Sequence, residues 1–155
     1  MNTVNEPGRS KRPMTTDPME SAPVSSTTLE RLAIIAASAL VISGTVHLME
    51  APGTMGDATY LGLSFYAHFF VTLAAAIGIL MGSRMAWGLG AFVSAASIGM
   101  YVISRTVGLP GQSGEQWTEW SGVIAVAAEA VALVATLAGL RVVRTVRSTR
   151  LVATA

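Results

Sequence analysis

The chain of 155 residues contains no cysteine. A disulfide bond, a thiolate metal site and a cysteine-ligated iron–sulfur cluster are therefore excluded. Cysteine usage also gives no information on the redox state of the compartment. Charged residues are also scarce, at 12% of the chain, against about 25% in a typical soluble domain. Hydrophobic residues make up 52%. This composition is typical of a membrane protein, and the length suffices for one domain.

Motifs for common enzyme chemistry are missing as well. The chain has no glycine-rich phosphate loop, no Gly-x-Ser-x-Gly nucleophile motif and no His-Glu-x-x-His zinc motif. We therefore assign no catalytic residues and no metal ligands from the sequence. The identity of any cofactor stays unknown, and so does the question whether the protein is an enzyme.

Four apolar runs follow a polar N-terminal segment, and each has about the 20 residues that a helix needs to cross a bilayer. A soluble bundle would show a polar face on every helix, and these runs show none. Pro52 and Gly53 are expected to end the first run, and Gly108 and Pro110 to end the third. The predicted spans are residues 30–50, 60–81, 85–106 and 118–143.

The segments outside the apolar runs have a different composition. Residues 1–28 are rich in Pro, Ser, Thr and charge and lack a hydrophobic period, which predicts a disordered head. Residues 29–143 form the predicted transmembrane domain. Residues 144–155 form a basic tail, which we expect to meet anionic lipid rather than nucleic acid, because a positive flank of the last span already explains its charges.

The basic residues predict the orientation. If the chain crosses four times, nine of the ten lie on one side: Arg9, Lys11, Arg12, Arg31, Arg84, Arg141, Arg144, Arg147 and Arg150. The other side holds Arg105 together with four acidic residues, Glu50, Asp57, Glu115 and Glu119. The positive-inside rule then places both termini in the cytoplasm and the protein in the plasma membrane. Short connections predict an all-α, four-helix transmembrane bundle of up-down-up-down topology.

Small residues at four-residue spacing predict where the helices touch, because lipid gives no hydrophobic drive for helix association and close backbone approach must replace it. These residues are Ala74, Gly78 and Gly82, then Ala91, Ala95 and Gly99, and finally Ala128, Ala132 and Thr136. We expect the bilayer to be the main partner, with other membrane protein subunits as further candidates.

Polar residues recur at helical spacing in every span and can face the bundle interior together. Counted from outer ends near Ala51, Tyr60 and Trp120, His47 lies ~6 Å deep, His68 ~12 Å and Glu129 ~13 Å, at ~1.5 Å per residue. The ionisable groups thus fall in the outer half of the bundle. The predicted ligand- or cofactor-binding cluster comprises His47, His68, Tyr101, Arg105 and Glu129.

Glu129 is costly in hydrocarbon and needs a partner or a cavity. Arg105, His68 and Tyr101 are the expected partners, and a purely structural pair is one interpretation. A haem held by the two histidines is another, although their estimated levels differ. A divalent metal bound by His47, His68, Glu50 and Glu129 is a third, and a quinone or lipid head-group pocket lined by His68, Tyr101 and tryptophans a fourth. Proton-coupled transport is disfavoured because the inner half lacks ionisable groups.

The third span ends in Tyr101-x-x-Ser104-Arg105-Thr106-x-Gly108-Leu109-Pro110-Gly111, the first is followed by Ala51-Pro52, and the fourth carries Glu129. In these features, over about residues 30–140, the chain resembles a group of four-span membrane proteins of high-GC actinobacteria. Members of that group often have a second histidine in the first outer loop, and Ala51–Thr59 has none. The resemblance implies the fold and the membrane location. We expect a non-enzymatic accessory or structural component, with a haem-, quinone- or metal-binding redox protein as the alternative.

Overall fold

The computed structural model describes residues 24–110 and 119–153. Within these ranges the chain forms four α-helices: α1 Val24–Asp57, α2 Thr59–Leu80, α3 Arg84–Thr106 and α4 Trp120–Ala153. All four are long and apolar enough to cross a membrane. These four helices confirm the prediction of an all-helical fold with four candidate membrane spans in the described residues. Most of the predicted disordered head lies outside the described residues, but its last part belongs to α1, and the predicted basic tail continues α4.

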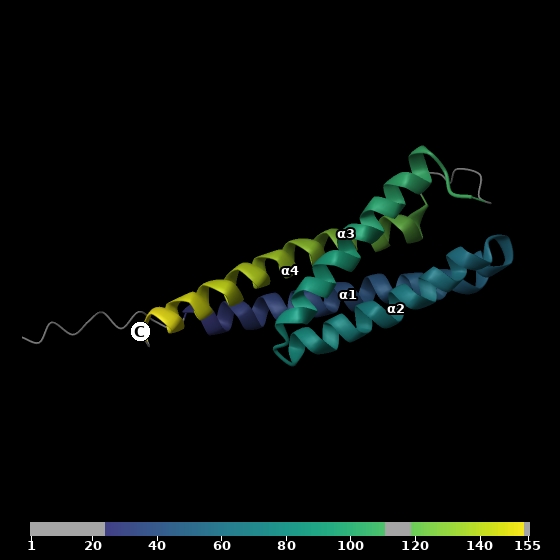
Figure 1. Ribbon diagram of the computed structural model, residues 1–155. Coiled ribbons are helices and arrows are strands. Elements are labelled where there is room, and N and C mark those ends of the chain that lie inside the picture. The colour runs from purple at the N-terminus through teal and green to yellow at the C-terminus, as the bar shows by residue number, and fades with distance from the viewer. Residues whose placement is uncertain (1–23, 111–118, 154–155) are drawn as a thin grey trace, which may run out of the picture.

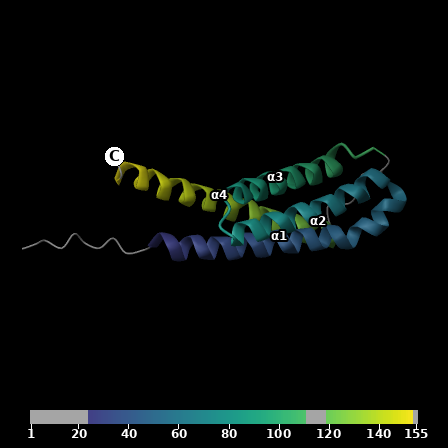
Figure 2. The same cartoon turned by 60° about the horizontal axis from the view of Figure 1, so that its bottom comes forward.

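The helices are arranged as a ring of four. Helix α1 packs along α2 and α4, and α3 packs along α4 and, less extensively, α2. We call the end that holds Asp57, Thr59 and Thr106 the α1–α2 end, and the end that holds the Leu80–Arg84 turn the α2–α3 end. Figure 1 shows the α1–α2 pair and the α3–α4 pair diverging toward the α1–α2 end, and Figure 2 shows the same bundle from another side.

Glycines with positive φ end α2 and α3. Gly82 has φ 78°, and the Ser83 and Gly82 amides donate to the carbonyls of Gly78 and Ile79 at 2.8 and 2.9 Å. This pattern is a Schellman C-cap, which satisfies carbonyl groups that the helix end leaves open. Gly108, with φ 82°, follows the last turn of α3 and confirms the predicted end of that helix.

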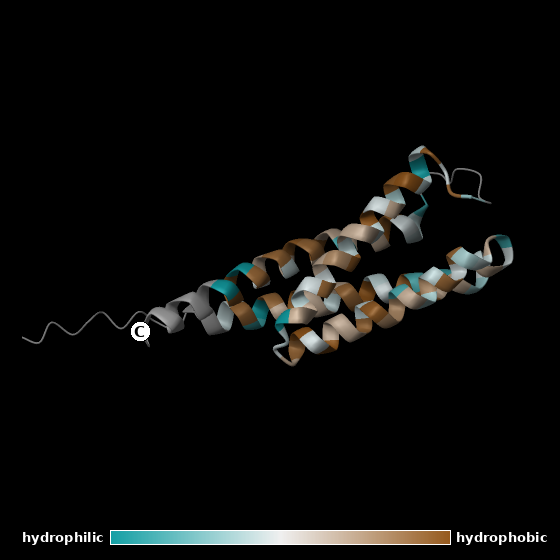
Figure 3. Ribbon diagram, viewed as in Figure 1, coloured by the Kyte–Doolittle hydropathy of each residue, from teal (hydrophilic) through white to brown (hydrophobic). Residues whose placement is uncertain are grey.

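Small residues and one tryptophan form the core near the α2–α3 end. Trp87 is 2% exposed and lies directly against Gly139, where a Cβ atom would meet its ring. A Cβ atom at Gly90 would likewise meet the side chains of Thr136 and Leu40. The remaining buried members of this core are mostly alanines: Ala36, Ala37, Ala39, Ala75, Ala76, Ala86, Ala132 and Ala135. Figure 3 shows apolar residues along all four helices and hydrophilic ones mainly near helix ends.

The predicted small-residue stripes locate these contacts only in part. Gly78 meets Ala86, and Ala91, Ala132 and Thr136 are buried. The other predicted positions include four that are exposed: Ala74, Gly82, Ala95 and Gly99. Small residues occur on lipid-facing surfaces as well as in helix contacts, so spacing alone does not identify the contacting face.

Helix α1 is longer than predicted. Pro52 lies inside it, and the helix continues to Asp57 instead of ending at Pro52 and Gly53. The extra length changes the level of the first histidine. Counted from Asp57, His47 lies ~15 Å along the helix, while His68 lies ~14 Å from Thr59, at ~1.5 Å per residue. The predicted difference in level between the two histidines is therefore wrong.

Candidate functional site

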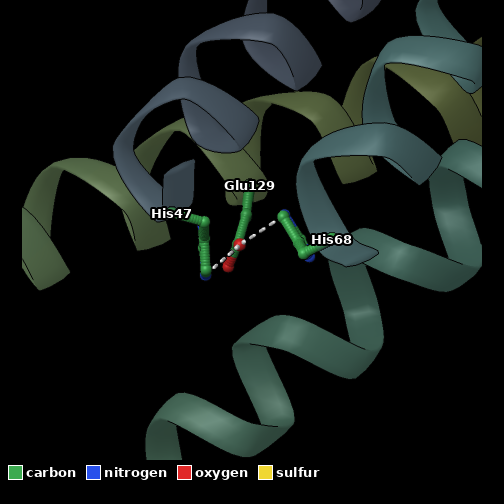
Figure 4. Close-up of side chains that lie close together, drawn as sticks. All are labelled: His47, His68 and Glu129. Carbon is green, nitrogen blue, oxygen red and sulfur yellow. Dashed lines mark ion pairs between the residues drawn. The ribbon is translucent and has the colours of Figure 1, made fainter. Parts of the chain in front are cut away.

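Three helices bring His47, His68 and Glu129 together (Figure 4). The Nε2 atom of His47 lies 3.8 Å from Glu129 Oε1, and the Nε2 atom of His68 lies 3.6 Å from the same oxygen. One ligand atom from each residue falls within 4.8 Å of the others. The Glu129 side chain is 2% exposed and the histidines 13% and 10%, so the three groups are largely shielded from solvent.

Ser43 holds this cluster in place. Its hydroxyl donates to Glu129 Oε1 at 2.9 Å, and its backbone carbonyl lies 2.9 Å from His47 Nδ1. A carbonyl oxygen only accepts, so Nδ1 of His47 carries a proton, and Nε2 faces Glu129. The Ser43 hydroxyl donates its one hydrogen bond to the carboxylate, so in the 3.2 Å contact with His68 the imidazole Nε2–H donates to Ser43 Oγ.

Ring contacts fix the two imidazoles. The rings of His47 and His68 stack with centroids 4.0 Å apart and planes 29° apart, and Phe65 meets His47 edge-on at 5.0 Å. A haem held by two histidines needs one imidazole on each face of the porphyrin. Stacked rings leave no space between them for the macrocycle. The geometry therefore does not suit the haem interpretation.

The cluster forms the floor of a cavity of about 280 Å³ that all four helices line. All five residues of the predicted cluster line this cavity: His47, His68, Tyr101, Arg105 and Glu129. Much of the remaining wall is apolar and includes Val46, Phe65, Val93, Met100 and Val126. Helical spacing thus identified side chains that share one space, and whether they bind a cofactor stays a prediction.

Arg105 has a different ionic partner from the one expected. Its Nη2 atom lies 3.2 Å from Glu119 Oε2, its Nη1 donates to Ser104 Oγ, and its guanidinium sits 4.6 Å from the Tyr101 ring centroid. Glu129 instead lies close to the two histidines, of which His68 was an expected partner and His47 was not. Arg105 lies eight positions beyond Ser97, which is within hydrogen-bonding reach of Glu129, and this is ~12 Å along α3. That separation explains why the predicted Arg105–Glu129 pair does not form.

Carboxyl groups outnumber guanidinium and amine groups on the cavity wall. The described lining residues include one guanidinium, Arg105, and three carboxyl groups, Glu50, Glu119 and Glu129, in addition to the two imidazoles. A cavity of this charge attracts cations. Glu50 lines it but does not belong to the three-residue cluster.

The cluster has the donor set of a transition-metal site. Tetrahedral coordination with bonds of about 2.1 Å places neighbouring ligand atoms ~3.4 Å apart. The two histidine nitrogens lie within about 0.4 Å of that distance from Glu129 Oε1. In His47, a backbone carbonyl binds the proton on Nδ1 and Nε2 faces the carboxylate, which is the arrangement found in histidine ligands of metals. His68 can coordinate through Nε2 only when its proton moves from Nε2 to Nδ1.

Comparison with known protein families, with curated proteins and with solved structures finds no match to this chain. Function must therefore be argued from the site itself. Two residues in the site have roles that the sequence did not predict. The link that Ser43 makes between Glu129 and both histidines was not predicted, and Glu119 was noted only as an acidic residue of the outer side. Three-residue spacing cannot reveal partners on other helices.

Proposed function

We propose that the protein is a small plasma-membrane protein that holds one divalent transition-metal ion through His47, His68 and Glu129. Three convergent ligand atoms at the closed end of an acidic cavity are the observation that carries this proposal. Two imidazoles and one carboxylate favour ions such as Zn²⁺ or Fe²⁺ over Mg²⁺ and Ca²⁺, which prefer oxygen ligands. The three protein ligands leave at least one position open toward the cavity, where a water molecule or a substrate atom can bind.

The orientation is part of the proposal. Lys and Arg residues are concentrated on the side of both termini, which favours cytoplasmic termini by the positive-inside rule. The cavity then opens toward the outer face, because Glu50, Arg105 and Glu119 lie toward the α1–α2 end. A metal ion would reach the site from outside the cell.

Metal titration tests the proposal. The protein is first freed of metal with a chelator in neutral detergent. Calorimetry should then show binding of one equivalent of Zn²⁺ or Co²⁺ and no binding of Mg²⁺ at millimolar concentration. Glu129→Gln keeps the shape of the side chain and removes its charge. We expect it to lose at least ~100-fold in affinity, more than the ~10–100-fold typical of groups that only orient a ligand.

Glu50→Gln is the matched control, since it removes a carboxylate of the same cavity from outside the cluster. Its affinity should fall much less than that of Glu129→Gln, because the exposed Glu50 carboxylate acts on the ion through its charge alone. Equal losses in the two variants would mean that the cavity merely concentrates cations. Absence of binding by the wild-type protein would refute the metal site.

A non-enzymatic accessory or structural role is the second candidate. The hydrogen bonds from Ser43 to Glu129 and from His68 to Ser43 tie three helices together without any ion. In this case Glu129→Gln should lower the thermal midpoint of the metal-free protein in detergent, and the chain should co-purify with another membrane subunit. An unchanged midpoint and a lone chain would count against this role.

A further inference from the structure

Five of the residues that line the cavity are exposed. Glu50 and Glu119 lie toward the α1–α2 end, whereas Ser64 on α2 and Ala96 and Met100 on α3 lie farther along the bundle. Ser64 lies ~8 Å from the start of α2 and Met100 ~9 Å from the end of α3, so the two are level across the bundle. They lie well inside the membrane-spanning lengths of these helices.

The helical wheel shows which way these residues face. Each residue turns the helix by about 100°. On α2, Phe65 contacts His47 of α1. Ser64 is turned about 100° from Phe65 around the helix axis, so it lies on the edge of the cavity-lining face that is remote from α1. On α3, Tyr101 and Arg105 lie against Gly122 of α4. Ala96 and Met100 lie on the opposite edge of the cavity-lining face of α3, away from α4. The exposed residues of both helices therefore border the α2–α3 seam.

Contacts close the seam above and below this level. At the α1–α2 end the Tyr60 hydroxyl donates to the Pro110 carbonyl at 2.8 Å, joining α2 to the segment after α3. At the α2–α3 end, Gly78 and Ala86 are in direct contact. The exposed lining residues Ser64, Ala96 and Met100 lie between these two contacts, and we call this part of the α2–α3 seam the window.

The dimensions and charge of the cavity limit what can enter. About 280 Å³ admits a head group of one ring but not a whole lipid, whose tail would remain in the bilayer. Three carboxyl groups against one guanidinium disfavour an anionic phosphate head. Hydroxyl and imidazole groups on the wall can hydrogen-bond carbonyl or hydroxyl oxygens, and the apolar wall suits the ring itself.

We propose that this window admits a neutral membrane-dissolved lipid whose single-ring head group carries oxygen atoms, as a quinone does. The head group lies in the cavity and the tail passes between α2 and α3. This binding does not require the metal ion, so a negative result for the metal site would not contradict it.

The absence of native cysteine makes the window directly testable. Met100→Cys places a thiol at the window, and Val102→Cys is its matched control: the native residues are 46% and 44% exposed and lie two positions apart on different faces of α3. Metal-free protein in phosphatidylcholine nanodiscs is treated with maleimide, with and without a short-tailed benzoquinone whose ring carbons are all substituted, so that the quinone does not itself add the thiol. We expect the thiol at 100 to react through the water of the cavity and the thiol at 102 to react far more slowly.

The quinone should slow the reaction at position 100 by about tenfold, equivalent to 1.4 kcal/mol of protection. Equal rates at positions 100 and 102 would overturn the window. Protection by added phosphatidylglycerol but not by the quinone would replace the neutral ligand with an anionic lipid, and protection by neither would refute lipid binding.

A plugging variant gives a second measurement. Met100→Trp fills the window with a larger side chain and should abolish the quinone-dependent rise of the thermal midpoint, while Val102→Trp should retain it. A plugged protein that still responds to the quinone would contradict entry between α2 and α3.

Discussion

Toward the α2–α3 end, Trp87 lies against Gly139 within a shell of alanines. Toward the α1–α2 end, the same four helices diverge and enclose a cavity with His47, His68 and Glu129 at its floor. Helices in lipid associate through close packing rather than through a hydrophobic drive. The packed half therefore supplies the stability, and the open half can keep polar groups that contribute little to it. Variants in the two halves should separate these roles.

Gly139→Leu should have the largest effect, because even a Cβ atom at this position meets the Trp87 ring. Overpacking of this kind costs about 1–3 kcal/mol and sometimes more. We expect the thermal midpoint in detergent, measured by circular dichroism, to fall by a large amount. Gly88→Leu is the control, since its Cβ would meet no atom within 4 Å. Equal midpoints for the two variants would contradict the assignment of stability to the Trp87 core.

His68→Ala should show the opposite behaviour. The imidazole borders an existing cavity, so its removal enlarges that space without disturbing the alanine core. We expect the metal-free midpoint to move by the equivalent of about 1 kcal/mol, while Zn²⁺ affinity measured by calorimetry falls at least ~100-fold. A variant that unfolds as readily as Gly139→Leu would show that the cluster is a structural element.

Much of the fold could be predicted from the sequence because apolar length is a direct requirement of the bilayer. Gly108 correctly marked the end of α3, since a left-handed residue there ends a helix. Pro52 misled the prediction: a proline near a helix end interrupts one hydrogen bond but need not stop the helix, and α1 continues past it. That single error displaced His47 by about two turns and hid the fact that the two histidines share a level.

The members of the site were easier to predict than their pairing. Spacing of three and four residues identified one face of each helix, and the five predicted residues do line one cavity. Pairing depends on the rotation and level of each helix relative to its neighbours, which no single helix encodes. For this reason Arg105 was paired with Glu129 rather than Glu119, and Ser43 was not predicted as the shared partner.

Ser43→Ala should have an intermediate effect within the open half. The hydroxyl is buried and donates to the Glu129 carboxylate, so its loss leaves the ligand free to rotate. Removal of such an orienting group typically lowers metal affinity by about 10–100-fold. Calorimetric titration with Zn²⁺ measures this directly. Affinity equal to that of the wild type would mean that Ser43 does not position the carboxylate.

Glu119→Gln should have the smallest effect. The Glu119 side chain is 48% exposed, and exposed ion pairs contribute no more than about 1 kcal/mol. Thermal unfolding at low and high salt should show a small difference from the wild type that shrinks as salt increases. A shift as large as that of Gly139→Leu would place the main stabilising contact at the open end.

X-ray absorption at the zinc edge of the loaded, purified protein tests the metal site most directly. Two imidazole nitrogens and one carboxylate oxygen at about 2.0–2.2 Å, with a further light atom from solvent, are the expected ligands. His47→Ala should remove one imidazole contribution from the spectrum. A spectrum with oxygen ligands alone, or one that is unchanged in His47→Ala, would contradict the metal site at the floor of the cavity.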